Sequence, residues 1–127
     1  VQKLVTIDVS SAVSSASARK IGLMVANSPL VKTAIAGEDA NWGRIVMAVG
    51  KSGEPADRDK LSISMGGVPI TDCGSVREDY AEGPVAEHMK GQNVHIAIDI
   101  GLGRGQARVW TCDLTHGYIS INADYRS

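Results

Sequence analysis

Residues 93–100 read NVHIAIDI, and residues 107–114 read ARVWTCDL after a short glycine-rich stretch. In the first segment every second residue is a branched apolar one, namely Val94, Ile96, Ile98 and Ile100. Strict alternation of this kind is typical of a half-buried β-strand. The intervening Gly101, Gly103 and Gly105 predict a hairpin turn, with the second segment as the return strand. The C-terminal third of the chain is therefore expected to be rich in β-structure.

The first residues of the chain predict a strand followed by a helix. Val5, Ile7 and Val9 alternate with polar residues, which favours a strand starting within a few residues of Val1. Apolar residues then recur at helical spacing over residues 18–25, with Ser14 or Ser15 as N-cap. Because a strand begins so close to the terminus, we expect Val1 to mark a cut inside a longer polypeptide.

The middle of the chain alternates between the two kinds of pattern. A second helix is predicted over residues 40–49, with Asp39 as its N-cap. Strands are predicted over residues 61–65 and 68–71, joined by a Gly-Gly turn. Ser75 has capping-box spacing to Glu78 and predicts the start of a helix that is interrupted at Gly83 and Pro84 and ends at Gly91. A last strand is expected over residues 118–125.

These elements together predict an α/β (α+β) fold in which helices pack on one face of a layered, mixed sheet. A length of 127 residues suits a single domain spanning residues 1–127. Residues 27–44, NSPLVKTAIAGEDANWGR, are crowded with charged and amide groups between the two apolar helical patterns. Such groups need partners when buried, so we interpret this run as a rigid, specifically packed connector, rather than a site of chemistry.

Composition excludes several classes of protein. Hydrophobic residues make up 43% and charged residues 21%, with a formal net charge of −1, so the basic stripe of a nucleic-acid-binding protein is missing. No apolar run approaches the ~20 residues that a membrane helix needs, and no signal-peptide pattern is visible. We therefore expect a cytoplasmic protein without nucleic-acid or membrane partners. Cys73 and Cys112 are too few for a disulfide framework, and both are predicted to be reduced core residues.

Several groups of residues could form a catalytic or binding site, but each has a simpler structural interpretation. The glycines of residues 101–105 open no helix, so a turn is favoured over a phosphate cradle. The cysteines and histidines lack zinc-ligand spacing, and no metal site is predicted. Cys112 with His116 suggests a cysteine hydrolase, yet a thiol buried on a strand is favoured. The acidic residues near the third helix are expected to be its solvated face.

Asn122 and Ser127 stand out near the C-terminus. By alternation Asn122 lies on the polar face of the last predicted strand, opposite Ile119 and Ile121. The patterning alone favours an ordinary solvent-facing residue at this position. A hydroxyl and a terminal carboxylate at Ser127 would lie near that amide. These residues by themselves do not decide a function.

Motifs along the whole chain resemble the ornithine acetyltransferase family, also called glutamate N-acetyltransferase or the bifunctional arginine biosynthesis protein. They are NSPLVKTA, GEDANWGR, RVWTCDL and the ending INADYRS. The resemblance implies transfer of an acetyl group from N-acetylornithine to glutamate, and some members also use acetyl-CoA as a substrate. It implies no cofactor. A precursor of this family cleaves itself into an alpha and a beta chain, and the new N-terminal Thr of the beta chain is the nucleophile. The implied assembly is a heterotetramer of two alpha and two beta chains.

This sequence resembles only the C-terminal portion of the beta chain. It lacks the cleavage site, the nucleophilic Thr and the family's substrate-binding Glu, so no catalytic residue is predicted within it. By resemblance, Asn122 and Ser127 are the family's substrate-binding Asn and its terminal Ser or Thr. An amide and a hydroxyl can together orient an amino-acid substrate. Two alternatives remain open, namely a non-catalytic α+β assembly module and an aminopeptidase relative with an N-terminal nucleophile.

Overall fold

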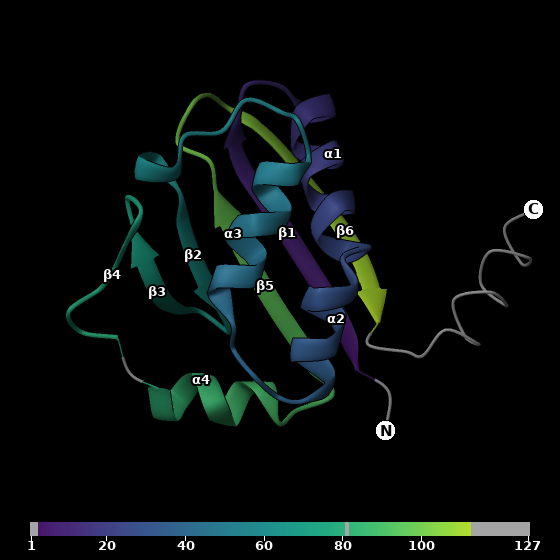
Figure 1. The fold of residues 1–127 in the computed structure, drawn as a ribbon, viewed down its shortest axis with the longest axis vertical. Coiled ribbons are helices and arrows are strands. Elements are labelled where there is room, and N and C mark those ends of the chain that lie inside the picture. The colour runs from purple at the N-terminus through teal and green to yellow at the C-terminus, as the bar shows by residue number, and fades with distance from the viewer. Residues whose placement is uncertain (1–2, 81, 113–127) are drawn as a thin grey trace, which may run out of the picture.

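The computed structural model describes residues 3–80 and 82–112, in which helices pack on one side of a twisted sheet (Figure 1). Along the chain the elements are β1 (Leu4–Ala12), α1 (Ser15–Ala26), α2 (Pro29–Ala36), α3 (Trp42–Lys51), a 3-10 turn η1 (Arg58–Lys60), β2 (Ser62–Met65), β3 (Val68–Asp72), β4 (Ser75–Val76), α4 (Glu82–Met89), β5 (Asn93–Asp99) and β6 (Gly105–Cys112). The predicted mixed α+β architecture is confirmed.

The sheet has six strands in the order β4-β3-β2-β5-β1-β6. β1 pairs in parallel with β5 and antiparallel with β6, so the first strand lies between the two strands that come last along the described chain. The predicted hairpin between β5 and β6 is therefore wrong. Their connection crosses the end of β1, where the backbone N–H groups of Leu102 and Gly103 both donate to the carbonyl of Ser11. A Cβ at Gly103 would lie 2.6 Å from the carbonyl oxygen of Ala12, so this crossing requires glycine.

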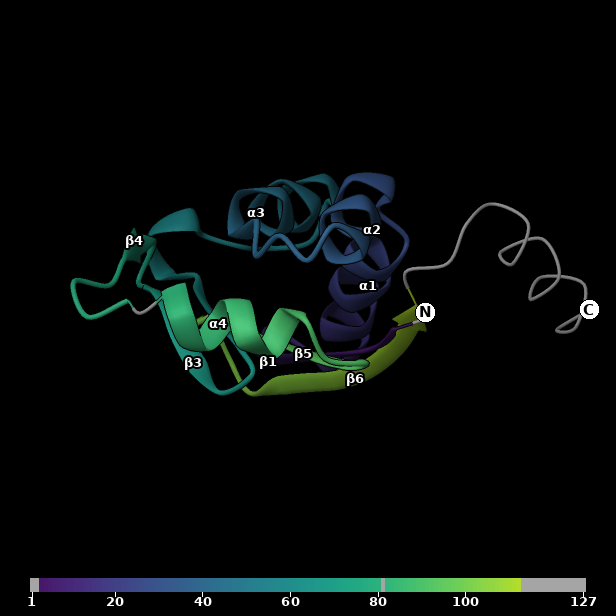
Figure 2. The same ribbon diagram turned by 90° about the horizontal axis from the view of Figure 1, so that it is seen from below.

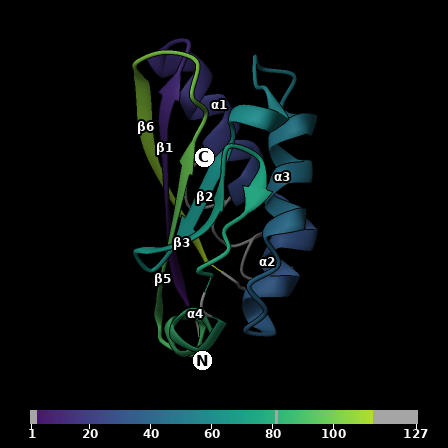
Figure 3. The same cartoon turned by 90° about the vertical axis from the view of Figure 1, so that its left-hand side faces the viewer.

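The helices form one layer. Figure 3 views the sheet from its edge, with α1, α2 and α3 on one side of it, and Figure 2 shows the same two layers from below. α4 lies across one end of the sheet. The alternating apolar residues of β1 and β5, which include Val5, Ile7, Ile96 and Ile98, are buried beneath the helices. The core is built from aliphatic side chains, as the scarcity of aromatic residues requires.

The other side of the sheet carries no helix in the described part of the chain. We call it the open face and define it by Leu4, Thr6 and Asp8 of β1, His95 of β5, and Arg108, Trp110 and Cys112 of β6. These residues alternate with the buried ones, and the register places Thr6 beside both His95 and Trp110. Val109 on β6 lies against Gly22 of α1, which directs the neighbouring Trp110 to the open face.

The polar run 27–44 is a helical segment rather than a connector. α2 occupies its first half, with Ser28 as N-cap and Pro29 in the first turn, as helix starts favour. Residues 37–41 then lead into α3. The Asn41 side chain accepts a hydrogen bond from the backbone N–H of Arg44 and caps this helix, so the prediction of Asp39 as the cap is wrong.

Two further predictions need correction. Ser75 begins the two-residue strand β4 instead of a helix, and α4 starts only at Glu82, with Gly83 and Pro84 in its first turn. Cys73 is exposed and Cys112 is half-buried, so neither thiol belongs to the core. The predicted last strand, residues 118–125, lies outside the described residues.

Candidate functional site

The substrate-binding residues predicted from the sequence, Asn122 and Ser127, lie outside the described residues, and so does His116 of the Cys112–His116 hypothesis. Their roles stay predictions. The described part of the chain contains three polar clusters, which lie on the open face, at the end of α4, and at the turn between β3 and β4. Each of them is a candidate for the site to which this chain contributes.

The first cluster is centred on Asp8 of β1, the strand that lies between β5 and β6. Its carboxylate accepts from Nε and Nη2 of Arg108 at 2.6 and 3.1 Å, in a bidentate arrangement. The Oδ2 atom also lies 2.6 Å from Nε2 of His95. Arg108 faces Asp8 directly across the β1–β6 ladder, and His95 comes from the parallel neighbour β5. Three strands thus hold one carboxylate between two nitrogen-bearing side chains.

The guanidinium of Arg108 lowers the pKa of the Asp8 carboxyl below its ordinary value of 3.8, against the opposing effect of partial burial, and His95 lowers it further. The same contact raises the pKa of Arg108. Asp8 is therefore a carboxylate at neutral pH and is unsuited to donating a proton. A depression of about 480 Å³ lies beside it, lined by residues 8–10 of β1 and 106–108 of β6. This cluster presents a fixed pair of opposite charges, the Asp8 carboxylate and the Arg108 guanidinium. It is not suited to general acid catalysis, which would need a carboxyl group with a raised pKa.

The second cluster is built around Lys3, whose side chain is buried at the end of the sheet. Its ammonium donates at 2.8 Å to the carbonyl oxygen of Met89, the last residue of α4, and at 2.7 Å to that of Gly91, two residues beyond the helix. It also forms an ion pair with Glu38 at 3.3 Å. Glu38 sits between α2 and α3 with a positive φ of 58°. Lys3 therefore ties β1, α4 and the α2–α3 connection together.

A depression of about 220 Å³ adjoins this cluster, lined by acidic residues and a phenol. Glu38, Asp39, Tyr80 and Glu82 line it together with the apolar Ala40, Val85 and Ala86. Burial raises the pKa of Tyr80, and the charges of Glu82 and Asp39 raise it further, so the phenol is neutral at physiological pH. The cluster is acidic and hydrogen-bonding, without a nucleophile.

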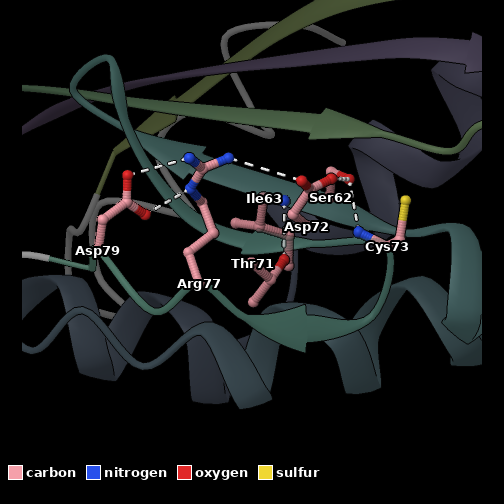
Figure 4. Close-up of polar contacts among 7 residues, drawn as sticks. All are labelled: Ser62, Ile63, Thr71, Asp72, Cys73, Arg77 and Asp79. Atoms are coloured by element: carbon pink, nitrogen blue, oxygen red, sulfur yellow. Dashed lines mark hydrogen bonds and ion pairs between the residues drawn. The ribbon is translucent and has the colours of Figure 1, made fainter.

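The third cluster closes the β3–β4 turn, as Figure 4 shows. Arg77 binds both carboxylate oxygens of Asp79 at 2.7 and 3.0 Å and approaches Asp72 at 3.5 Å. The Ser62 hydroxyl accepts from the backbone N–H of Cys73 and donates to Asp72. The adjacent Asp72 carboxylate raises the pKa of the Cys73 thiol, which disfavours the reactive thiolate. These contacts hold the turn in one conformation, and the Cys73 thiol is not activated as a nucleophile.

Among residues 3–80 and 82–112, no group of three or more His, Cys, Asp or Glu side chains is placed to hold a metal ion. No helix in the same part of the chain is long and apolar enough to cross a bilayer. The sequence reasoning missed the Asp8 and Lys3 clusters because their partners come from distant strands and from a helix end. The alternation of Val5, Ile7 and Val9 did place Asp8 on the face opposite the core, but it carried no information on the register with β6.

The model of the ArgJ family matches residues 1–127, which is the whole chain. This chain belongs to the ArgJ family. Among curated relatives, the arginine biosynthesis bifunctional protein ArgJ of Gluconobacter oxydans is 69% identical over 98% of the chain. The protein of the same name from Zymomonas mobilis is 64% identical over 98% of the chain.

A solved structure supports the ArgJ-family fold. The crystal structure of the arginine biosynthesis bifunctional protein ArgJ from Bacillus halodurans matches 97% of this chain with a TM-score of 0.86 and 34% sequence identity. The match covers 58% of that solved chain. The chain spans only 30% and 31% of the length of the two curated ArgJ relatives. The sequence-based identification of the family is thus confirmed, and the activity of a whole ArgJ protein is a matter for proposal.

Proposed function

We propose that this chain is the C-terminal portion of the beta chain of an acetyl-transferring ArgJ enzyme of arginine biosynthesis, and that it folds as one domain. One observation carries the proposal, namely the match of the ArgJ family model to residues 1–127. The 69% identical relative named as an arginine biosynthesis bifunctional protein supports it. The proposed reaction moves an acetyl group from N-acetylornithine to glutamate, and acetyl-CoA is a further acetyl donor in a bifunctional enzyme.

The proposed chemistry has two acyl transfers. The hydroxyl of an N-terminal Thr attacks the acetyl carbonyl of N-acetylornithine, and ornithine leaves as the free amine. The amine of glutamate then attacks the acetyl-threonine ester, which gives N-acetylglutamate and restores the hydroxyl. Oxyanion stabilisation belongs to the alpha chain in this proposal. No cofactor takes part.

The described residues support placing the nucleophile elsewhere in the enzyme. An activated nucleophile needs a base within hydrogen-bond reach or a lowered pKa. The thiol of Cys73 has a raised pKa beside Asp72. His95 is engaged by Asp8, and that carboxylate is shared with Arg108. Within residues 3–80 and 82–112, no hydrogen bond joins a hydroxyl or a thiol to a histidine base.

In the proposed enzyme, Asn122 and Ser127 bind the amino-acid substrate. Their amide and hydroxyl groups offer both donors and acceptors for the α-nitrogen and the α-carboxylate that N-acetylornithine and glutamate each carry. The alpha chain of the same precursor completes the site, in an assembly of two alpha and two beta chains in the cytoplasm.

Reconstitution tests the proposal. The 127-residue chain is joined to the remaining portion of the Gluconobacter oxydans relative, and glutamate-dependent deacetylation of N-acetylornithine is measured. We expect activity from the joined protein and none from the 127 residues alone. Activity of the isolated chain by itself would contradict the assignment of the nucleophile, and an inactive but folded joined protein would contradict the acetyltransferase function.

Point variants in the joined protein test the two site residues. Asn122→Ala and Ser127→Ala are expected to raise KM or lower kcat by about tenfold to a hundredfold, because each removes an orienting hydrogen bond of about 1.5–3 kcal/mol. Asn27→Ala is the matched control, since Asn27 is exposed between α1 and α2. Kinetics of Asn122→Ala that equal those of Asn27→Ala would remove Asn122 from the site.

The same assay separates the alternatives. A joined protein that hydrolyses peptide substrates and ignores N-acetylornithine would favour the aminopeptidase relative. A protein that assembles but catalyses neither reaction would favour the non-catalytic α+β module.

A further inference from the structure

We propose that residues 118–123, which lie outside the described residues and within the last strand that the sequence predicts, add a strand to the sheet. The added strand pairs antiparallel with the outer edge of β6, through a hairpin turn at residues 115–117. The proposal rests on the exposed edge of β6, on the orientation of its side chains and on the pattern of the residues that follow it. This strand pairing does not depend on the acetyltransferase reaction.

β6 leaves a long edge of the sheet open. It is the last strand in the order β4-β3-β2-β5-β1-β6, so within the described part of the chain it pairs with β1 alone. The strand runs for eight residues, whereas β4 at the opposite edge has two. A long edge presents a row of backbone N–H and C=O groups, and proteins usually keep such edges short or cover them. We therefore expect β6 to have a second partner strand.

The orientation of β6 determines which face the side chains of a partner strand occupy. Val109 is buried against Gly22 of α1, and the neighbouring Trp110 is exposed on the open face. Odd-numbered residues of β6 thus point to the helices and even-numbered ones to the open face. In an antiparallel pair, residues directly opposite each other point to the same face. The apolar residues of a partner strand should therefore lie opposite odd-numbered residues of β6.

The residues that follow β6 have the pattern that this geometry requires. Ile119, Ile121 and Ala123 alternate with a phenol, a hydroxyl and an amide at the even-numbered positions from 118 to 122. Paired with β6, the three apolar side chains would extend the core beside Val109, under the helices. The polar side chains would continue the open face. The segment therefore fits the edge of β6 on both of its faces.

The residues between the two strands select the register. Thr115, His116 and Gly117 suit a three-residue hairpin loop, because glycine at the third position can adopt the left-handed conformation that this loop requires. A loop of this length sets Leu114 opposite Tyr118 and leaves the apolar residues on the helical side. A two-residue loop would shift the pairing by one residue and turn all of them to the open face.

This register gives the substrate-binding residues a place in the fold. Asn122 lies opposite Trp110 on the open face, and Ala123 lies opposite Val109 as the last residue of the ladder. The four residues that remain are enough for one turn, which can bring the hydroxyl of Ser127 back towards the amide of Asn122. The amino-acid substrate then binds beside Trp110, at the edge of the open face. This placement of the substrate rests on the proposed function, whereas the strand pairing does not.

A disulfide equilibrium tests the pairing, because the chain already carries a thiol on β6. In the proposed register Cys112 lies opposite Ser120, so a Ser120→Cys variant places two Cα atoms at the ~5.5 Å that a disulfide spans. Ile119→Cys is the matched control, since it is one residue nearer along the chain but points to the other face. Both variants carry Cys73→Ser, which removes the exposed third thiol. The full 127-residue chain is equilibrated in glutathione buffers, and the linked peptides are quantified by mass spectrometry.

We expect the effective concentration of the 112–120 thiol pair to exceed that of the 112–119 pair by at least about tenfold, because the ladder holds only the first pair on one face. Equal values for the two pairs, or a higher value for the control, would overturn the proposal, since an unpaired chain end would not favour position 120. An intermolecular disulfide as the main product of Ser120→Cys would also overturn it, and would identify a second copy of the chain as the partner of β6.

Hydrogen exchange of β6 gives an independent measurement. Ile121→Asp places a charge on the covered, helical side of the added strand, and Ser120→Asp places one on the open face. We expect Ile121→Asp to speed the exchange of β6 amides by at least about tenfold, with Ser120→Asp close to the parent chain and the amides of β2 unchanged in both. Equal effects of the two variants on β6 would contradict the added strand. Neither measurement uses catalytic activity, so a failure of this proposal is distinguishable from a failure of the proposed function.

Discussion

The backbone N–H of His95 on β5 donates a hydrogen bond to ring atom Nε2 of His88 on α4, across 2.9 Å. A ring nitrogen accepts only when it carries no proton, so this contact requires a neutral His88 with its proton on Nδ1. Burial lowers the pKa of His88 below its ordinary 6.5, and the nearby His95 and Lys3 lower it further. The attachment of α4 to the sheet is thereby linked to the protonation of one imidazole.

This linkage predicts that stability falls in mild acid. The folded pKa of His88 lies below the unfolded value of about 6.5, so the unfolded state binds the proton more readily. The contribution of His88 is therefore fully present above pH ~6.5 and is lost as the pH falls through the folded pKa, with a slope of at most about 1.4 kcal/mol per pH unit. Urea unfolding between about pH 5 and pH 8 would measure it.

The His88→Gln variant isolates this effect. The Gln side-chain oxygen can accept the bond from His95 but takes up no proton in this pH range. We expect the stability of the variant to depend less on pH between about 5 and 6.5 than that of the parent chain. Parallel curves for the two proteins would rule out a linked His88.

Gly66, in the turn between β2 and β3, lies directly against the His88 ring. A Cβ at Gly66 would lie 2.4 Å from Cγ of His88, and the backbone φ is +59°. Gly66→Ala is expected to lower the free energy of unfolding by about 1 kcal/mol because of the left-handed backbone, and by a further ~2 kcal/mol because of the steric overlap.

The neighbouring Gly67 is a matched control for this prediction. It has φ +79°, but no atom lies within 4 Å of the place that a Cβ would occupy. Gly67→Ala should therefore lower the free energy of unfolding only by the cost of the left-handed backbone, which is about 1 kcal/mol. Denaturant unfolding of both variants provides the comparison. Similar losses would mean that the His88 ring moves aside without cost.

Asn41 caps α3 with a hydrogen bond from the backbone N–H of Arg44. Asn41→Ala is expected to lower the free energy of unfolding by about 1 kcal/mol. Asp39 is the cap that the sequence pattern predicts, and it is exposed before the helix begins. Asp39→Ala should change stability by less than about 0.5 kcal/mol. Chemical denaturation of the two variants decides between the caps, because a larger loss for Asp39→Ala would restore the sequence-based assignment.

Lys3 is 7% exposed and donates to the two carbonyls at the end of α4 as well as to Glu38. Lys3→Met keeps most of the side-chain volume but leaves those carbonyls without their donor. We expect the free energy of unfolding to fall by about 2–3 kcal/mol. Lys20→Met is the control, because the Lys20 side chain is 69% exposed and its ion pair with Glu54 spans 3.9 Å. That variant should lose less than about 0.5 kcal/mol in thermal or denaturant unfolding.

The sequence predicts well those elements whose pattern is local. The alternation in β1 and β5, the Ser14 cap of α1 and the Gly66–Gly67 turn are all confirmed by the structure. Each of these features depends on residues within one turn or one strand of each other, so propensity and periodicity suffice.

The sequence-based predictions are wrong where the structure depends on residues that are distant in the sequence or on competing local interactions. The sequence pattern misses α2 because its eight residues form a short helix beside a run of polar and charged groups, although Ser28–Pro29 is a common helix start. The predicted β5–β6 hairpin is wrong because β1 takes the place between the two strands, which no short-range pattern reveals. The Asp8 cluster combines three strands from both ends of the sequence, so its geometry could not be read from any one segment.

The position of β1 has a consequence for how the protein is made. Its two neighbours, β5 and β6, are synthesised last among the described elements, after all the helices. During translation, α1, α2 and α3 emerge when β1 is the only strand of the described sheet that exists, and their apolar sides have no sheet to cover. Non-local pairing of this kind is slow, because a long loop must close before any contact forms. The nascent chain therefore depends on late completion of its sheet, and an interruption of synthesis before Asn93 would leave an aggregation-prone product.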